Sequence, residues 1–269
     1  MSTANTLPND PHILKMHDIS KAFKGLMAVN QYHLELKKGE ILAIIGPNGA
    51  GKSTIFNLIT GYLHPTSGEI WFASQEITHF SPDKISRLGI GRTFQNIRLF
   101  SSMTVLENVM TARQLHHPYS IFSALSGYGK FPKSEKKLVE ESLEQLTLFE
   151  LAEMANVNAM TLSYGGQRRL EIVRALALRP FLMLLDEPTA GMSRHESMEI
   201  LQLIRRIRDQ YDLTIIIVEH NMPVAMQLCD RMQVLSYGEI IAEGTADEIR
   251  TNPKVIEAYL GKEEADVIL

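Results

Sequence analysis

The first part of the chain alternates between apolar and polar positions. The stretch YHLELKKGEILAII, which ends at Ile45, keeps this two-residue period, and residues 13–45 are predicted to form β-strands. The apolar spacing then becomes that of a helix in KSTIFNLITGYL, and Gly61 is placed to end this helix. Four residues of the helix can share one face: Ile55, Leu58, Ile59 and Tyr62.

The middle of the chain has a different character. Residues 68–73 are predicted as one more strand, and a short helix is expected to begin at Pro82, after Ser81. Two helical stretches follow, TVLENVMTARQL and SEKKLVEESLEQLTLFE, and the Gly-, Pro- and Tyr-containing linker 117–133 separates them. We interpret residues 100–162 as a mostly helical subdomain inserted into a sheet domain.

After residue 163, helices alternate with strands that are apolar throughout, such as FLMLLD and TIIIVE. Such strands are typical of a parallel sheet that helices cover on both faces. The predicted fold class is therefore α/β. Residues 13–99 and 163–260 form a mainly parallel core with an N-terminal antiparallel β subdomain, and together with the helical insertion they make one domain, 13–260. Residues 1–12 and 261–269 are expected to be flexible ends.

Composition excludes some classes of function. With 269 residues, 45% of them apolar, the chain can bury a substantial core. Its formal net charge of -4 argues against a broad basic surface, so no nucleic-acid partner is expected. The single cysteine, Cys229, fits a reducing compartment. The opening residues lack a signal-peptide pattern and the apolar runs are too short for a membrane span, so we expect a cytosolic protein that could dock on a membrane protein.

The strand that ends at Ile45 runs directly into GPNGAGKST, which matches the spacing G-x-x-x-x-G-K-[ST] between a predicted strand and a predicted helix. Glycines let the backbone curl so that its N–H groups face phosphate oxygens, and the helix adds its positive N-terminal end. Lys52 is expected at the β- and γ-phosphates, and Ser53 Oγ is a hard ligand suited to Mg²⁺. The predicted nucleotide-binding residues of this loop are Gly46, Pro47, Asn48, Gly49, Ala50, Gly51, Lys52, Ser53 and Thr54.

Two adjacent carboxylates, Asp186 and Glu187, end the apolar strand FLMLLD. Neighbouring side chains on a strand point to opposite faces, but at the end of a strand the two can diverge. Asp186 can then hold Mg²⁺ while Glu187 orients and polarises the attacking water, a division that suits phosphoryl transfer. A strand that ends in Asp-Glu-Pro is by itself more often a solvated turn, and it is the phosphate loop upstream that favours the catalytic interpretation.

Three segments together resemble an ATP-binding cassette (ABC) ATPase: GPNGAGKST, LSYGGQRRLEIVRAL and LLDEPTAG. The second resembles the signature segment of that family and is the most specific, since many other ATPases also carry a phosphate loop. The resemblance implies an ABC ATPase fold of the P-loop NTPase class, and hydrolysis of ATP with Mg²⁺ as cofactor.

The resemblance also implies roles for residues outside the phosphate loop and the acid pair. Phe23 lies where these proteins place the aromatic ring that stacks on adenine, and Gln95 resembles the glutamine that reaches Mg²⁺ and the water. His220, directly after TIIIVE, resembles the switch histidine that contacts the γ-phosphate. The signature residues are expected to close on the γ-phosphate held by the opposite subunit, so that a monomer has half of each site: Ser163, Tyr164, Gly165, Gly166 and Gln167.

The chain departs from the family pattern after the acid pair. Many cassettes have Ser-Ala-Leu-Asp where this chain has Ala190, Gly191, Met192 and Ser193. Because a serine can still donate and accept hydrogen bonds, the two subunits are expected to communicate through Ser193, with altered coupling left open.

Three classes of protein use this ATPase fold. Chromosome and DNA-repair ATPases carry a long coiled coil between the two halves of the cassette, whereas here a short helical segment separates Gln95 from Ser163. Translation factors of this type carry two cassettes, and this chain has one phosphate loop and one signature. A transporter subunit remains, and its pore must come from other chains.

The resemblance is closest to the ATP-binding subunits of branched-chain amino acid importers, through GIGRTFQNIRLFSSMTVLENVM, EPTAGM and IAEGTADEIRTNPKVIEAYLG. Importers for urea or short amides use similar cassettes, so the substrate stays open between these classes. The implied partners are two membrane permease subunits, a sister ATP-binding subunit or a second copy of this chain, and a periplasmic or extracellular substrate-binding protein. The implied location is the cytoplasmic face of the plasma (inner) membrane, reached through the permeases.

Overall fold

The structure, a computed structural model, describes residues 10–113 and 131–260. The tail 261–269, residues 1–9 of the predicted flexible start and most of the predicted linker lie outside the described residues. Residues 10–12 were expected in the flexible start, but here they are ordered: Asp10 Oδ1 accepts a hydrogen bond from His12 N, and Asp10 Oδ2 accepts one from Lys15 Nζ.

An antiparallel sheet forms from the alternating N-terminal sequence. In its second strand Tyr32, Leu34 and Leu36 are buried while the residues between them are exposed, as the two-residue period of a half-buried strand requires. In spatial order the strands are β2 (Leu26–Lys37), β1 (His12–Phe23), β4 (Ser67–Phe72) and β5 (Gln75–Glu76).

A second sheet is mainly parallel and forms the core of the molecule. Among the described strands of this sheet, only β10, at one edge, runs antiparallel to its neighbour, β9. In spatial order the strands are β10 (Glu239–Gly244), β9 (Arg231–Ser236), β3 (Ile41–Ile45), β8 (Thr214–Val218), β7 (Leu182–Asp186) and β6 (Ile90–Arg92). The predicted mainly parallel core and antiparallel β subdomain are therefore both confirmed.

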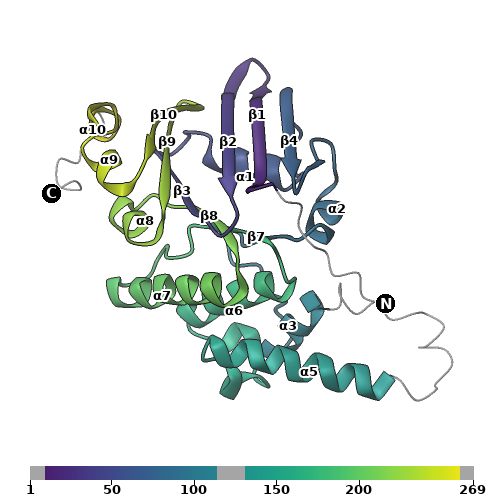
Figure 1. Cartoon of the computed structure of the whole chain (residues 1–269). Helices are drawn as coiled ribbons and strands as arrows, with labels where there is room; N and C mark the ends of the chain where they lie inside the picture. The colour runs from purple at the N-terminus through teal and green to yellow at the C-terminus, as the bar shows by residue number, and fades with distance from the viewer. Residues whose placement is uncertain (1–9, 114–130, 261–269) are drawn as a thin grey trace.

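The core sheet is buried on both faces because its strands are apolar at every position. In β3, Leu42 and Ile44 pack with α1 (Lys52–Ile59) and the antiparallel sheet, whereas Ile41, Ala43 and Ile45 pack on the opposite face. Figure 1 shows the antiparallel sheet above the core sheet and the long helices below it. The helices on the lower face are α6 (Tyr164–Ala177), α7 (Arg194–Tyr211) and α8 (Met222–Leu228).

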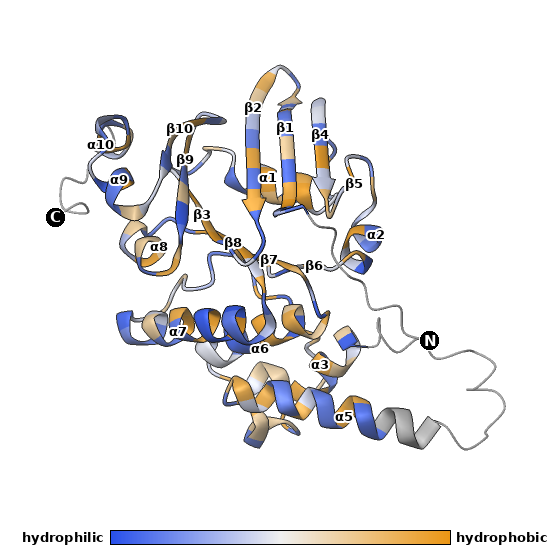
Figure 2. Ribbon diagram, in the orientation of Figure 1, coloured by the Kyte–Doolittle hydropathy of each residue, from blue (hydrophilic) through white to orange (hydrophobic). Residues whose placement is uncertain are grey.

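The predicted helical insertion lies beyond α6 and α7, at the bottom of Figure 1. It contains α3 (Val105–Arg113), α5 (Phe131–Leu148) and the 3-10 helices Ala152–Met154 and Ala159–Thr161. Helix α5 carries hydrophilic and hydrophobic residues on different sides (Figure 2), and its buried residues include Leu138, Ser142 and Leu146, which follow a helical spacing. Helix α5 begins at Phe131, inside the predicted linker.

Helix α1 ends just before Gly61, as predicted, so the apolar spacing that continues to Tyr62 extends beyond the helix. It ends at Ile59, and Gly61 follows with φ +72, a conformation in which a Cβ would lie 2.4 Å from Phe80 O. The turn carries Tyr62 away from the buried face, where Ile55, Leu58 and Ile59 lie as predicted. Tyr62 is therefore exposed, and the prediction that it shares that face is wrong.

The remaining helices lie near the edges of the molecule. Helix α2 (Pro82–Arg87) begins after Ser81, as predicted, and α9 (Ala246–Arg250) and α10 (Pro253–Leu260) follow β10 at one side of Figure 1. None of the helices in the described ranges is both long enough and apolar enough to cross a membrane.

Candidate nucleotide-binding and hydrolysis site

The predicted phosphate loop connects β3 to α1. Its turn is closed by a hydrogen bond from Ala50 N to Pro47 O of 3.2 Å, and α1 starts with Ile55 N donating to Gly51 O at 3.0 Å. Gly51 adopts φ +108, where a Cβ would lie 2.6 Å from Ala28 O. No other residue fits this position without moving β2, so the glycine is required by packing as well as by backbone conformation.

The side chain of Lys52 folds back into the phosphate loop that precedes α1. Its Nζ donates to Gly46 O at 2.5 Å and to Pro47 O at 3.0 Å, and the residue is 6% exposed. Burial lowers the Lys52 pKa from its ordinary value, while the charges of Glu187 and Asp186 raise it. The ammonium group therefore lies among backbone carbonyls and close to the acid pair, where it can exchange the carbonyls for phosphate oxygens.

The loop residues that follow Lys52 are open to ligands. Ser53, at the start of α1, is exposed, and Thr54 is partly buried. On the other side of Lys52, Asn48 and Gly49 are exposed at the tip of the loop, while Gly46 and Ala50 are buried beneath it.

Asp186 is the last residue of β7 and is buried. Its Oδ2 pairs with Arg92 NH2 at 3.2 Å, and its backbone N donates to Thr93 Oγ1 at 3.1 Å. Burial raises the Asp186 pKa, and Arg92 opposes that rise. Arg92 NH1 in turn donates to Asn57 Oδ1 and Thr60 Oγ1 at the end of α1. The arginine thus fixes the carboxylate relative to the phosphate-loop helix, a role that no sequence motif indicated.

Glu187 diverges from Asp186 because its backbone turns at this residue. Its φ is +46, in the left-handed region, and its N–H donates to Val218 O of the neighbouring strand at 2.9 Å. The side chain then reaches two other predicted site residues: Glu187 Oε2 accepts a hydrogen bond from Gln95 Nε2 at 3.2 Å and lies 3.7 Å from His220 Nδ1. The divergence expected for the acid pair is therefore present, with a backbone cause.

A fully buried acid lies directly before His220. Glu219 is 0% exposed, and its Oε1 accepts hydrogen bonds from Thr189 N and Thr189 Oγ1. Burial is the main cause of its raised pKa, which the two Thr189 hydrogen bonds oppose. This contact joins the end of β8 to the segment that carries Glu187, and the sequence offered no local signal for it beyond the unusual charge at the end of an apolar strand.

The signature segment begins α6. Ser163 is the N-cap, and its Oγ accepts a hydrogen bond from Gly166 N at 3.2 Å. Gln167 Nε2 donates to Leu162 O at 3.0 Å. The Ser163 hydroxyl and Tyr164 are exposed, while Gly165, Gly166 and Gln167 are partly buried. The segment thus presents a hydroxyl and a helix N-terminus at the surface of this chain, as a second anion-binding surface requires.

Helix α6 also fixes the loop that carries Gln95. Arg168 is 2% exposed, and its guanidinium donates to Phe94 O at 2.9 Å and to Gln95 O at 2.5 Å. Glu171 pairs with Arg168 at 3.0 Å and accepts a hydrogen bond from Phe94 N at 3.2 Å. No sequence motif indicated this pair, although two charged residues three positions apart on the buried face of a helix are a detectable signal.

Two predicted residues lie outside this cluster of contacts. Phe23 is at the end of β1, is 42% exposed and lies beside Lys21 Nζ, which is 5.2 Å from the ring centroid. Its ring is available for stacking, and its role with adenine stays a prediction. Ser193 is the N-cap of α7 and forms a capping box with Glu196, so its hydroxyl is committed within this chain.

The phosphate loop, Glu187 and His220 lie at the carboxyl ends of β3, β7 and β8, the edge where parallel sheets bind ligands. Gln95 reaches Glu187 from the loop that follows β6. A lysine that can exchange carbonyls for phosphates and a carboxylate shared by an amide and an imidazole are the parts that phosphoryl transfer to water needs. Fold and site together define a P-loop nucleotide hydrolase.

Comparisons with known proteins agree with this class. The family model described as ABC transporter matches residues 29–190, and the model described as branched-chain amino acid ATP-binding cassette transporter matches residues 239–265. The chain is 40% identical over 250 residues to the high-affinity branched-chain amino acid transport ATP-binding protein BraF of Pseudomonas aeruginosa, covering 93% of this chain and 98% of that protein. The LivG protein of Escherichia coli K12, which carries the same description, matches with the same identity and coverage.

Among solved structures, the ADP conformation of an ATP-binding cassette of an ABC transporter superposes with a TM-score of 0.81 at 32% identity, covering 93% of this chain and 99% of that one. The chain belongs to the ABC transporter family. It is an ATP-binding cassette ATPase, a component of a transporter, as the sequence analysis predicted.

Proposed function

We propose that this chain hydrolyses magnesium-ATP at the site described above and thereby energises the import of branched-chain amino acids. The observation that carries the catalytic part is the position of Glu187 Oε2, which lies within reach of both Gln95 and His220. The substrate class is supported by the names of the relatives and by the match of residues 239–265 to a branched-chain amino acid cassette model.

In the proposed mechanism Glu187 polarises the attacking water, while Gln95 and His220 fix the orientation of its carboxylate. His220 also reaches the γ-phosphate. Lys52 leaves Gly46 O and Pro47 O and binds the β- and γ-phosphates, so the ammonium charge stabilises the oxygens that gain charge during transfer. Phe23 stacks on the adenine ring.

The donor set fits a magnesium ion. Mg²⁺ in such sites is bound by one or two protein oxygens together with substrate phosphates and water. Ser53 supplies an exposed hydroxyl at the start of α1, Asp186 supplies a carboxylate at the end of β7, and Gln95 supplies an amide oxygen. Within residues 10–113 and 131–260 no cluster of three or more His, Cys, Asp or Glu side chains could hold a metal ion by itself. When bound, the ion would neutralise phosphate charge.

The signature segment acts in a dimer. In this proposal Ser163 and the N–H groups at the start of α6 bind the γ-phosphate held by the other subunit, which is this chain's second copy or a sister cassette. ATP favours the closed pair because it contacts both halves only in that state. Hydrolysis removes that contact and reopens the pair.

A groove next to the loop that carries Gln95 is the proposed docking site for a membrane permease. It has a volume of 320 Å³ and lies between α2, β6, α3 and α6. Arg98 lies over the ring of Phe94 and Arg174 lies over the ring of Phe100, so the groove combines cationic and aromatic surface. A permease segment docked there would move with Gln95, because Arg168 ties that loop to α6. The chain would then lie at the cytoplasmic face of the membrane, and a substrate-binding protein outside would deliver the amino acid.

A second candidate substrate is urea or a short amide, because similar cassettes serve importers of those compounds. The test is uptake of labelled leucine, and separately of labelled urea, in a strain that lacks this gene and is complemented with wild type or with Glu187→Gln. Loss of leucine uptake that only wild type restores is expected. Loss of urea uptake with unchanged leucine uptake would overturn the substrate and keep the ATPase.

A further inference from the structure

The segment that carries Glu187 is held on both sides by the end of β8. Before the segment turns away, Glu187 N donates to Val218 O at 2.9 Å. Two residues further on, Thr189 N and Thr189 Oγ1 donate to Glu219 Oε1 at 3.3 Å and 2.8 Å. The next residue of the chain is His220, whose Nδ1 lies 3.7 Å from Glu187 Oε2. Residues 218, 219 and 220 therefore contact this segment one after another.

Thr189 uses all of its polar groups to hold the segment in place. The residue is 6% exposed, and its carbonyl oxygen accepts a hydrogen bond from Met192 N at 3.2 Å. Its N–H and its hydroxyl both donate to one oxygen of Glu219. The position of the segment after Glu187 therefore depends on a single buried carboxylate oxygen.

Glu219 is an unusual residue for its position in the core. The strand before it, β8, is buried at every position, and Glu219 itself is 0% exposed. Among the described residues its second oxygen, Oε2, has no hydrogen-bond partner. Burial of a carboxyl group with an unpaired oxygen costs stability, whereas an aliphatic side chain would fill the same space without that cost. What the carboxyl group adds is its pair of hydrogen bonds with Thr189.

Those two hydrogen bonds hold the backbone next to a strained residue. Glu187 has a φ of +46, and such a conformation persists only where the surrounding structure fixes it. The bond to Val218 O fixes the chain at Glu187 N, and the contact with Glu219 fixes it after Glu187. Loss of the second contact would let the Glu187 side chain move relative to His220 and Gln95.

The Glu219 backbone has a separate partner. Its N–H donates to Ile44 O at 3.4 Å, in the strand that leads into the phosphate loop. This bond does not involve the carboxyl group, so a change of the Glu219 side chain leaves it in place. The side chain can therefore be tested separately from the phosphate loop.

We propose that Glu219 and Thr189 are positioning residues for ATP hydrolysis, and that the hydrogen bonds between them fix Glu187 Oε2 beside Gln95 and His220. The inference rests on the proposed role of Glu187 as the base. Both residues act through Glu187 and contribute to the rate of hydrolysis rather than to the binding of ATP.

Glu219→Leu in the full-length protein removes the acceptor and keeps an apolar side chain of similar size. The kcat for magnesium-ATP is expected to fall about 10-fold or more, because a small misplacement of a reacting group has effects of this order. The KM for ATP should stay within about 2-fold of wild type, since the phosphate loop is unchanged. Glu219→Gln keeps an oxygen that can accept from Thr189 and should restore most of the lost rate. A merely structural Glu219 would give a Glu219→Leu variant with wild-type kcat.

Thr189→Val tests the other side of the contact and does not depend on the folding of Glu219→Leu. It removes the hydroxyl bond and leaves the Thr189 N–H in place, so a smaller loss of kcat is expected, about 3-fold, and Thr189→Ser should restore it. The double variant of Glu219→Leu and Thr189→Val should be no slower than Glu219→Leu alone, because both changes remove the same contact. Losses that add would show that the two residues act independently, against the inference.

Gln233→Leu is the matched control, because it also replaces a buried, hydrogen-bonded polar side chain by leucine. Gln233 is 1% exposed, its Oε1 accepts from Tyr32 OH at 2.5 Å, and its Nε2 donates to Glu243 Oε2 at 3.0 Å. This variant should be less stable to urea and keep kcat. An equal loss of kcat in Gln233→Leu would mean that the loss in Glu219→Leu follows from general destabilisation, which would overturn the inference.

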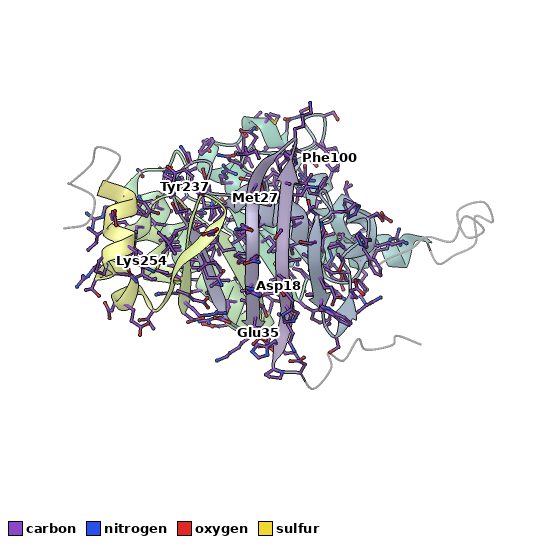
Figure 3. All side chains as sticks on the ribbon, turned by 90° about the horizontal axis from the view of Figure 1, so that it is seen from above. Asp18, Met27, Glu35, Phe100, Tyr237 and Lys254 are labelled. Carbon is purple, nitrogen blue, oxygen red and sulfur yellow. The ribbon has the colours of Figure 1, made fainter. Side chains whose placement is uncertain are left out.

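The control lies away from the phosphate loop. Gln233 Nε2 also donates to His33 O, and His33 pairs with Asp18. In Figure 3, Asp18 lies in the lower half of the molecule, whereas Tyr237 lies in the upper half. Tyr237 belongs to the β9–β10 turn that contacts the phosphate loop, through a hydrogen bond from residue 238 N to Ala50 O of 3.0 Å.

The outcomes separate this inference from the proposed function. Wild-type kcat in both Glu219→Leu and Thr189→Val, with Glu187→Gln inactive, would overturn the inference alone. Hydrolysis at the wild-type rate by Glu187→Gln would instead show that the proposed base is wrong.

Discussion

Glu187 has a backbone conformation that residues with a side chain rarely adopt. Its φ of +46 costs on the order of 1 kcal/mol or more, and the fold maintains it through Glu187 N bonding to Val218 O and Ala190 N bonding to Glu187 O. The result is that Asp186 stays in the sheet, paired with Arg92, while Glu187 turns to Gln95 and His220. The strained backbone separates the two adjacent acids, so that each is free for the different role proposed for it.

Substitution of Glu187 by Gln tests its role as the base. The amide keeps the size and the contact with Gln95, but it cannot accept the proton of the attacking water, so ATP hydrolysis should fall by about 10²-fold or more. ATP binding should remain, and a nucleotide-bound dimer should accumulate. Phosphate release and size-exclusion chromatography with ATP measure the two effects. Glu199→Gln, in α7 outside the site, is the control, and a Glu187→Gln variant that hydrolyses ATP at the wild-type rate would refute the assignment.

Glu219 predicts a pH dependence of stability. Burial raises its pKa above the ordinary 4.5, so the folded state binds a proton more tightly than the unfolded state does. Its contribution to stability is therefore complete below about pH 4.5 and is lost as the pH rises through the folded pKa, with a slope of at most about 1.4 kcal/mol per pH unit.

Glu219→Gln imitates the protonated acid and should remove this slope. Urea unfolding at pH 5 and pH 8 should show the variant gaining stability relative to wild type at the higher pH. Glu199→Gln, at a partly buried position in α7, should show no such gain. If wild type and Glu219→Gln kept a constant difference across this range, Glu219 would not titrate as described.

The sequence predicted the residues that are proposed to act on ATP and missed those that position them. Lys52, Asp186 and Glu187 belong to motifs whose spacing is local, so the chain alone indicates them. Arg92, Arg168 and Glu219 act through partners far away in the sequence, such as Asp186, Gln95 and Thr189. No local sequence pattern encodes these long-range contacts, and only the folded structure shows them.

Helix α6 joins two functional segments of one subunit. Its N-terminus carries the signature residues, and one turn further Arg168 binds the backbone of Phe94 and Gln95. The ring of Tyr164 also lies 3.3 Å from the position of a Cβ on Gly191, in the loop after the acid pair. A displacement of this helix would therefore reach both the Gln95 loop and the loop that follows Glu187.

Arg168→Met measures what this helix contact contributes. The variant leaves Glu171 buried without its cation, and breaking a buried pair in this way costs about 3–5 kcal/mol of unfolding free energy. Arg169→Met is a neighbouring control, since Arg169 pairs with the exposed Glu150 and the partly buried Glu199 and should contribute about 1 kcal/mol or less. Equal losses for the two variants in urea unfolding would show that Arg168 has no special role.

The sequence predicted secondary structure correctly in segments where one hydrophobic pattern, that of a helix or that of a buried strand, dominates. The helices α1, α6 and α7 and the apolar strands β3, β7 and β8 lie at predicted positions. The C-terminal elements β9, β10, α9 and α10 were not predicted, because segments such as Glu239–Gly244 are short and only partly buried. Their form depends on packing beside the core sheet, where β10, among the described strands, pairs with β9 alone.

The two predicted anion-binding surfaces are separate parts of the molecule. The phosphate loop leads into α1, which packs on the face of the core sheet that the antiparallel sheet covers. The exposed Ser163 begins α6, which packs on the opposite face. The signature segment contacts the 187–193 loop of its own chain, through Tyr164 and Gly191. We expect a second subunit to supply the signature for each phosphate loop, in a dimer with the two-fold symmetry that most dimers have.

Mixing two inactive variants tests this arrangement in full. Lys52→Ala should lose ATP binding at its own loop, and Ser163→Ala should lose the signature hydroxyl, at a cost of about 1 kcal/mol for the lost helix cap. In a dimer of one copy of each, one site carries both changes and the other carries neither. An equimolar mixture should then recover about a quarter of the wild-type ATPase rate, because half of the dimers are mixed and each has one intact site.

Phosphate release measured before and after mixing tests this expectation. No recovery, with size-exclusion chromatography showing that mixed dimers had formed, would mean that Ser163 serves its own subunit; recovery only after addition of a sister cassette would mean that this chain pairs with a different partner.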